Sequence, residues 1–213
     1  MAEIHYLLSK PDNIEIIRNR ITSILTTETE NQTALAEAAD AEDKNDYRIT
    51  VHTGQSGPWI TAPENAGADG SSVINISLDS VKQQSHPGGT VNEKKYTASF
   101  FIDCYGFSNA AGTPDSNTRA AGRAWKTARI VRNILMSGFY TNLGLRGTVK
   151  KREITGMKTE VPENTLNPDI SVMYCRITFT VDYIEESPQA EPVPLERIAF
   201  ESPDNNGEIN IKM

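Results

Sequence analysis

Polar and apolar side chains alternate over two stretches of the chain, and both stretches predict β-strands. Across Tyr96–Cys104 every second residue is apolar, and the same holds across Met173–Tyr183, where Arg176 and Asp182 are among the polar positions between them. Such an alternation gives a strand one apolar and one polar face. We therefore expect two long strands that each bury one side.

Two further segments repeat apolar residues at helical spacing. Pro11–Thr27 carries isoleucines three or four positions apart, and Ser9 precedes it as a candidate N-cap. We expect this helix to break near Asn31 and to resume through Ala34–Ala41. A second helix is expected over Thr118–Gly138, between the two long strands, with an alanine-rich side suited to close packing on a sheet.

Three shorter segments also alternate: Tyr47–His52, Val73–Leu78 and Thr148–Lys158. The third carries several basic residues, which are typical of an edge strand. Together the elements predict an α+β fold, with a mainly antiparallel sheet and helices packed on one face.

The expected organisation is a single α+β domain over residues 1–186 and an extended arm over 187–213. Residues 53–92 are rich in glycine and proline, and we interpret them as an inserted loop or β-arm. In the arm, Asn206-Gly207 predicts a hairpin too short to stand alone. Both segments either contact another copy or lie on their own domain. The candidate contact residues are Val73, Ile74, Ile76, Ile198, Phe200, Ile209 and Ile211.

Charge is distributed unevenly along the chain. The net charge is −7, of which residues 1–46 carry −6 and residues from 185 onward carry −5, so the body is basic by +4. This distribution suits association between unlike surfaces of two copies, or an acidic partner; the alternative is solvated acidic ends. No apolar run reaches the roughly 18 residues of a membrane helix. The N-terminus shows no secretion signal, and we expect cytosolic synthesis.

The second helix carries a basic side. Arg119, Arg123, Lys126 and Arg129 gather there, and we place Trp125 on the apolar side. Since no aromatic residue then interleaves the cations, a stacking platform for single strands is disfavoured. The basic side is expected either to meet a DNA backbone or an acidic partner, or to remain a solvated, salt-bridged face.

No arrangement of residues predicts catalysis or a bound metal. The three histidines lie in different segments, and CxxC, HExxH and phosphate-loop motifs do not occur. Cys104 and Cys175 fall on the apolar sides of their strands, and we expect both to be small buried residues. We therefore expect no catalytic residue, no cofactor and no metal, and a protein that is not an enzyme.

The order of elements resembles that of the tail-terminator and tail-completion proteins of long-tailed bacteriophages. The resemblance spans about residues 13–185. It rests on the strand Tyr96–Ile102, the alanine-rich basic helix around Arg119–Trp125 and the long strand Met173–Tyr183. Members of that family are small α+β proteins that form a six-fold ring at the head-proximal end of the tail tube. The family has no catalytic residues to carry over.

The resemblance implies a virion protein, assembled in the host cytoplasm, that forms a hexameric ring at the phage neck. Such a ring would terminate the tail tube or sheath and join the tail to the head connector, with double-stranded DNA passing non-specifically through its lumen. No membrane partner is expected. One alternative is another neck ring, namely a connector adaptor or a stopper. A further alternative is a nucleic-acid-binding module.

Overall fold

The computed structural model describes residues 10–42, 44–55, 72–84, 93–109, 114–162 and 170–186. The chain divides into two compact units, Pro11–Glu186 and the pair of terminal segments Met1–Lys10 and Ser187–Met213. Of the second unit, only Lys10 is described. The fold described is therefore that of the unit Pro11–Glu186.

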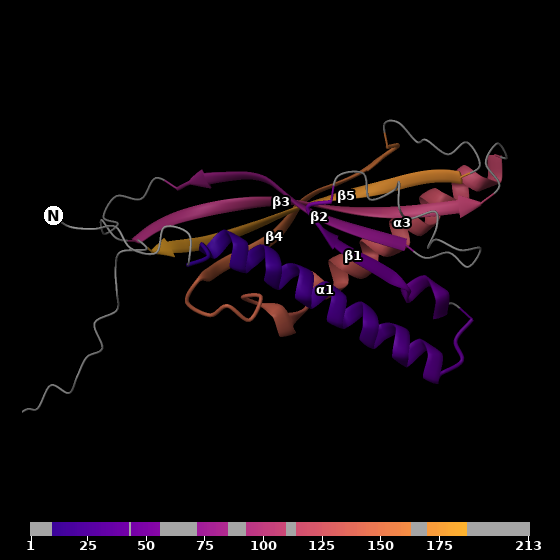
Figure 1. The fold of residues 1–213 in the computed structure, drawn as a ribbon, viewed down its shortest axis with the longest axis horizontal. Coiled ribbons are helices and arrows are strands. Elements are labelled where there is room, and N and C mark those ends of the chain that lie inside the picture. Colours follow the sequence, from indigo (N-terminus) through magenta and orange to yellow (C-terminus); the bar gives the residue numbers. More distant parts are fainter. Residues whose placement is uncertain are drawn as a thin grey trace, which may run out of the picture. The chain divides into compact units, whose positions relative to one another are not determined.

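Five strands form one open sheet in the order β1-β2-β3-β5-β4 (Figure 1). They are β1 (Ile49–Thr53), β2 (Ser72–Gln83), β3 (Glu93–Asn109), β4 (Val149–Glu160) and β5 (Ile170–Glu186). β1 and β2 are parallel, and every other neighbouring pair is antiparallel. The predicted α+β class and the edge position of β4 are confirmed.

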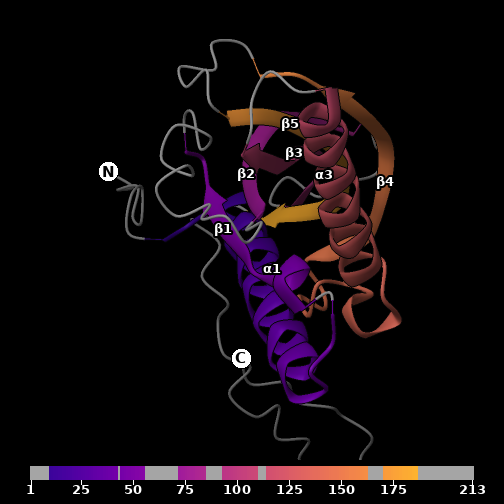
Figure 2. The same cartoon turned by 90° about the vertical axis from the view of Figure 1, so that its right-hand side faces the viewer.

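Two helices, α1 (Asn13–Ala38) and α3 (Pro114–Leu135), pack on the same face of this sheet (Figure 2). Short 3-10 turns follow each helix, η1 at Lys44–Tyr47 and η2 at Gly138–Tyr140. The shared core contains isoleucines of α1, alanines of α3 and alternate residues of β3 and β5, the pattern that the sequence predicted. Each fully buried isoleucine or phenylalanine stabilises the fold by about 1.5–3 kcal/mol.

Helix α3 lies unusually close to β3. A Cβ atom at Gly106 would lie only 2.2 Å from the carbonyl oxygen of Ala120. Ala120, Ala124 and Ala128 are fully buried at this contact. Small side chains on α3 and a glycine on β3 therefore let the two backbones touch.

The opposite face of the sheet holds a smaller core built around an ion pair. Asp103 of β3 accepts two hydrogen bonds from Arg176 of β5, at 2.7 and 2.8 Å, and only 3% of Asp103 is exposed. The guanidinium lies 4.3 Å from the ring centroid of Phe101. A buried carboxylate requires such a partner, because an unpaired charge in the interior is strongly unfavourable.

The first helix differs from the prediction in two ways. It is continuous through Asn31, so the expected break is wrong. Thr33 donates to the carbonyls of Thr29 and Tyr47, at 2.9 Å each, and the second contact ties the end of the helix to η1. Asp12, rather than Ser9, caps the helix, and its side chain accepts a hydrogen bond from the Glu15 N–H at 2.9 Å.

The expected excursion contains an integral strand. β2 lies between β1 and β3, and Val73, Ile74 and Ile76 are buried within their own sheet. The expectation that these three residues contact another copy is corrected, because packing in this sheet already covers them. The remaining candidates of that set, Ile198, Phe200, Ile209 and Ile211, lie outside the described residues together with the arm 187–213.

Candidate interaction surface on helix α3

Two hollows lie on either side of the outward ridge of α3, and Lys126 and Arg129 line both of them. The first hollow, of about 640 Å³, lies between α3 and α1. Its other lining residues include Glu28, Gln32, Tyr47, Phe139 and Tyr140. The second, of about 550 Å³, lies between α3 and β4. It is completed by Gly122, Trp125, Arg132 and Met157.

Helical geometry explains which side chains reach this surface. The buried positions of α3 recur at intervals of three or four residues, and the positions between them turn outward. Trp125 is one of these, and 48% of it is exposed. Our placement of Trp125 on the apolar side of the helix is therefore wrong. An aromatic ring does accompany the cations, contrary to the expectation from the sequence.

The four cations predicted to act together are divided by the structure. Arg123 donates to the carbonyl of Phe107 at 2.5 Å, and Lys126 forms an ion pair with Asp46. Arg119 and Arg129 are exposed and have no ion-pair partner among the described residues. Two of the four thus support the fold, while the other two remain available for a partner.

Arg132, which helical spacing places at the margin of the basic side, joins the available cations. It is exposed, it lines the second hollow, and the described residues offer it no ion pair. Every charged side chain that lines this second hollow is a cation. The hollow is therefore electropositive, with Trp125 and Met157 supplying apolar area.

The loop after α3 is held by a single side chain of the neighbouring strand. Arg152 of β4 donates to the carbonyls of Ser137, Tyr140 and Thr141, at 2.7, 2.5 and 3.0 Å, and also to that of Leu135. Burial lowers the pKa of this guanidinium, which still remains a cation. One cation thus binds several carbonyl groups at and after the end of α3 and stabilises the loop there.

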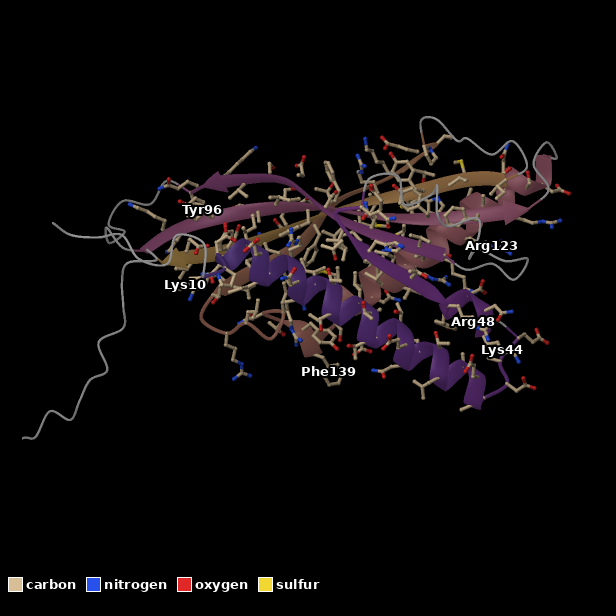
Figure 3. All side chains as sticks on the ribbon, in the orientation of Figure 1. Lys10, Lys44, Arg48, Tyr96, Arg123 and Phe139 are labelled. Atoms are coloured by element: carbon tan, nitrogen blue, oxygen red, sulfur yellow. The ribbon has the colours of Figure 1, made fainter. Side chains whose placement is uncertain are left out.

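This loop presents Phe139, which is 95% exposed. Figure 3 shows its side chain pointing away from the ribbon. Beside it, the Tyr140 hydroxyl donates to Glu28 of α1, and this hydrogen bond raises the pKa of Tyr140. No pattern in the sequence indicated Phe139, which lies on the loop after α3. We call Trp125, Arg129, Arg132 and Phe139, with the two hollows, the α3 surface.

Neither a metal cluster nor an exposed thiol lies among the described residues. Among the described residues, no group of histidine, cysteine and acidic side chains is arranged to hold a metal ion. Cys104 and Cys175 are free, buried and opposite each other on β3 and β5, as their predicted burial requires. Burial raises the pKa of both thiols, that of Cys175 to about 11. Neither thiol is poised as a nucleophile.

Comparison with known proteins adds no name to this surface. No family model and no curated protein matches the chain. No helix in the described part of the chain is long and apolar enough to cross a membrane.

Proposed function

We propose that this protein is a structural subunit of a bacteriophage neck. Its copies would form a ring that terminates the tail tube or sheath, joins the tail to the head connector and leaves a lumen for DNA. The resemblance in the order of elements supports the neck, and the observation that supports association of copies is the α3 surface. Trp125 and Phe139 are exposed there beside Arg129 and Arg132, on elements fixed by the core and by Arg152.

This combination of residues is characteristic of protein interfaces. Aromatic residues and arginine dominate the energy of association, while scattered exposed apolar residues contribute little. Phe139 is held by a loop whose carbonyls are bound to Arg152, so ordering it costs little entropy on binding. The surface is thus suited to a protein partner that supplies acidic and apolar groups.

A ring also accounts for the uneven charge of the chain. Copies in a ring use two different surfaces, one of which faces the next copy and the other the previous one. The acidic N-terminal segment, at −6, and the basic body, at +4, provide two such unlike surfaces. The tail tube, the sheath and the head connector are the further partners that this proposal implies.

Native mass spectrometry of the purified full chain, with negative-stain images of the same sample, tests the proposal. It predicts a closed ring of about six copies, as expected for a cyclic assembly. A chain that stays monomeric both alone and with tail tubes added would contradict it. The position of the ring in the particle would separate a terminator from an adaptor or a stopper.

A second candidate function is a nucleic-acid contact, which the exposed ring of Trp125 beside Arg129 and Arg132 favours. Stacking of bases on an aromatic ring, combined with backbone-binding cations, is typical of single-strand binding. The net charge of −7 opposes it. Tight, strongly salt-dependent binding of oligonucleotides by the isolated protein, lost in Trp125→Ala, would favour this function over a ring.

A further inference from the structure

The C-terminal end of α1 carries exposed acidic side chains at a place where they oppose the helix dipole. Glu37, Asp40 and Glu42 are exposed in or just after the last turn, which contains no basic residue, and Glu30 is exposed about two turns earlier. The C-terminus of a helix already bears a partial negative charge, so nearby carboxylates are unfavourable. This end of α1 is therefore strongly electronegative.

Neighbouring cations compensate for this charge only in part. Lys44 pairs with Asp40 at 2.7 Å and Arg48 with Glu37 at 3.1 Å, both beside the end of the helix (Figure 3). Both pairs are solvent-exposed, and exposed ion pairs of this kind contribute little to stability. In the described part of the chain, Glu30 and Glu42 form no ion pair at all.

The same end of α1 also exposes apolar area. Leu35 is 64% exposed, and Ala34, Ala38 and Ala39 are exposed around it. Helical spacing places Leu35 and Glu30 on either side of the exposed Ala34 and Ala38, and Glu42 follows the end of the helix. An apolar strip bordered by acids is the complement of the second hollow of the α3 surface. That hollow offers Trp125 and Met157 as apolar area and Lys126, Arg129 and Arg132 as its only charged lining.

We propose that the C-terminal end of α1 in one copy of the chain binds the second hollow of the α3 surface in the next copy. Leu35 would lie against Trp125, while Glu30 and Glu42 face Arg129 and Arg132. The inference rests on the assembly in the proposed function and names its interface. Because the two patches differ, a pair of copies still has one free patch of each kind, and the contact repeats head to tail.

A charge-swap experiment on the full chain tests this interface. One variant combines Arg129→Glu with Arg132→Glu, and the other combines Glu30→Lys with Glu42→Lys. Each variant alone brings like charges together, and its association should weaken by about a hundredfold or more. An equal mixture restores opposite charges at every contact. Native mass spectrometry should then show assemblies of wild-type size that contain both variants in equal numbers.

The matched control combines Lys82→Glu with Lys150→Glu, which makes the same charge change at exposed lysines of β2 and β4. This control should assemble like the wild type. Circular dichroism establishes that every variant is folded. The interface is overturned if either variant assembles normally, if the mixture fails to recover, or if the wild-type chain stays monomeric at the highest concentration tested.

The outcomes also separate this interface from the proposed function. If the wild type and both charge-reversal variants form closed rings, this interface is wrong and the proposed neck ring still stands. Recovery in the mixture, but in open chains or simple dimers, would support the interface and contradict the neck ring. A mixture that recovers as closed rings supports both.

Discussion

The two helices cover the same face of one sheet, yet they are built differently where they meet it. α1 contributes long branched side chains, with Ile17, Ile21 and Leu25 fully buried. α3 contributes alanines, and its backbone touches β3 at Gly106. α1 is therefore held away from the sheet by its side chains, while α3 lies directly on the strands.

The outward sides of the two helices differ as well. Several polar groups of α1 are bound within the chain: Arg20 donates to the Leu143 carbonyl at 2.8 Å, and Asn13 to the Ile184 carbonyl at 2.7 Å. On α3, Arg129 and Arg132 have no ion pair among the described residues, and Trp125 is half exposed. Amphipathic spacing thus predicts which side of a helix is buried, but not whether its polar side already has partners.

The close contact of α3 is the part of this comparison where a single substitution has the largest expected effect. Gly106→Ala should lower the free energy of unfolding by about 3 kcal/mol, because its methyl group overlaps the Ala120 carbonyl. Gly122→Ala is the matched control. No atom lies within 4 Å of its added Cβ, and stability should rise by about 0.5–1 kcal/mol. Urea denaturation measures both. Equal effects would show that α3 does not lie directly on β3.

Substitutions of two arginines near the end of α3 distinguish a structural role, expected for Arg152, from a binding role, expected for Arg129. Arg152→Met should destabilise the fold by about 2–3 kcal/mol, because the loop carbonyls lose a charged donor. Arg129→Met should change stability by less than about 0.5 kcal/mol and yet weaken association of copies. Thermal unfolding and analytical ultracentrifugation separate the two effects. A stability loss in Arg129→Met would show that this cation is needed by the fold.

A substitution at Phe139 tests whether the loop after α3 contributes to the association of copies. Phe139→Ser should leave stability within about 0.5 kcal/mol of the wild type, since the side chain is almost fully exposed. Its association should weaken by about tenfold, as for an aromatic residue at an interface. Thr27→Ala, at an exposed position of α1, is the control and should change neither quantity. Unaltered association in Phe139→Ser would exclude the loop from the interface.

The smallest effect concerns the two thiols beneath the helices. Burial raises the pKa of Cys104, and that of Cys175 from 9.0 to about 11, so the thiolate fraction at pH 8 is below that of an unfolded chain. Neither thiol should react with an aromatic disulfide reagent in the native protein, and both should react in denaturant. The folded state retains these protons longer, so stability should fall as pH rises from about 9 toward 11. Rapid native labelling would contradict their burial.

The sequence predicted the parts of the fold where one physical rule decides the outcome. β3 and β5 pair without a register shift, and the burial of their main apolar face followed from the alternation. The expectation that each strand buries only one side is corrected, because Asp103, Tyr105 and Phe107 are buried on the other face. In β2, the register shifts between Leu78 and Ser80, which breaks the alternation and conceals the second half of the strand. The continuity of α1 past Asn31 also escaped prediction, since it depends on a distant contact between Thr33 and η1.

The candidate site was only partly predictable, for a related reason. The basic character of α3 is evident from its residues, but the sequence cannot show that Arg123 and Lys126 have partners from other elements. Hydrophobicity alone placed Trp125 in the core, although its position on the helix turns it outward. Phe139 lies on a loop whose neighbouring carbonyls are bound by Arg152, a residue on another element.

An electron cryomicroscopy structure of the assembled protein would show whether the α3 surface holds copies of this chain together. Arg129 and Trp125 should be buried beneath the C-terminal end of α1 of the neighbouring copy, with Leu35 against the ring of Trp125. An assembly in which Arg129 and Trp125 face solvent or the lumen would contradict it.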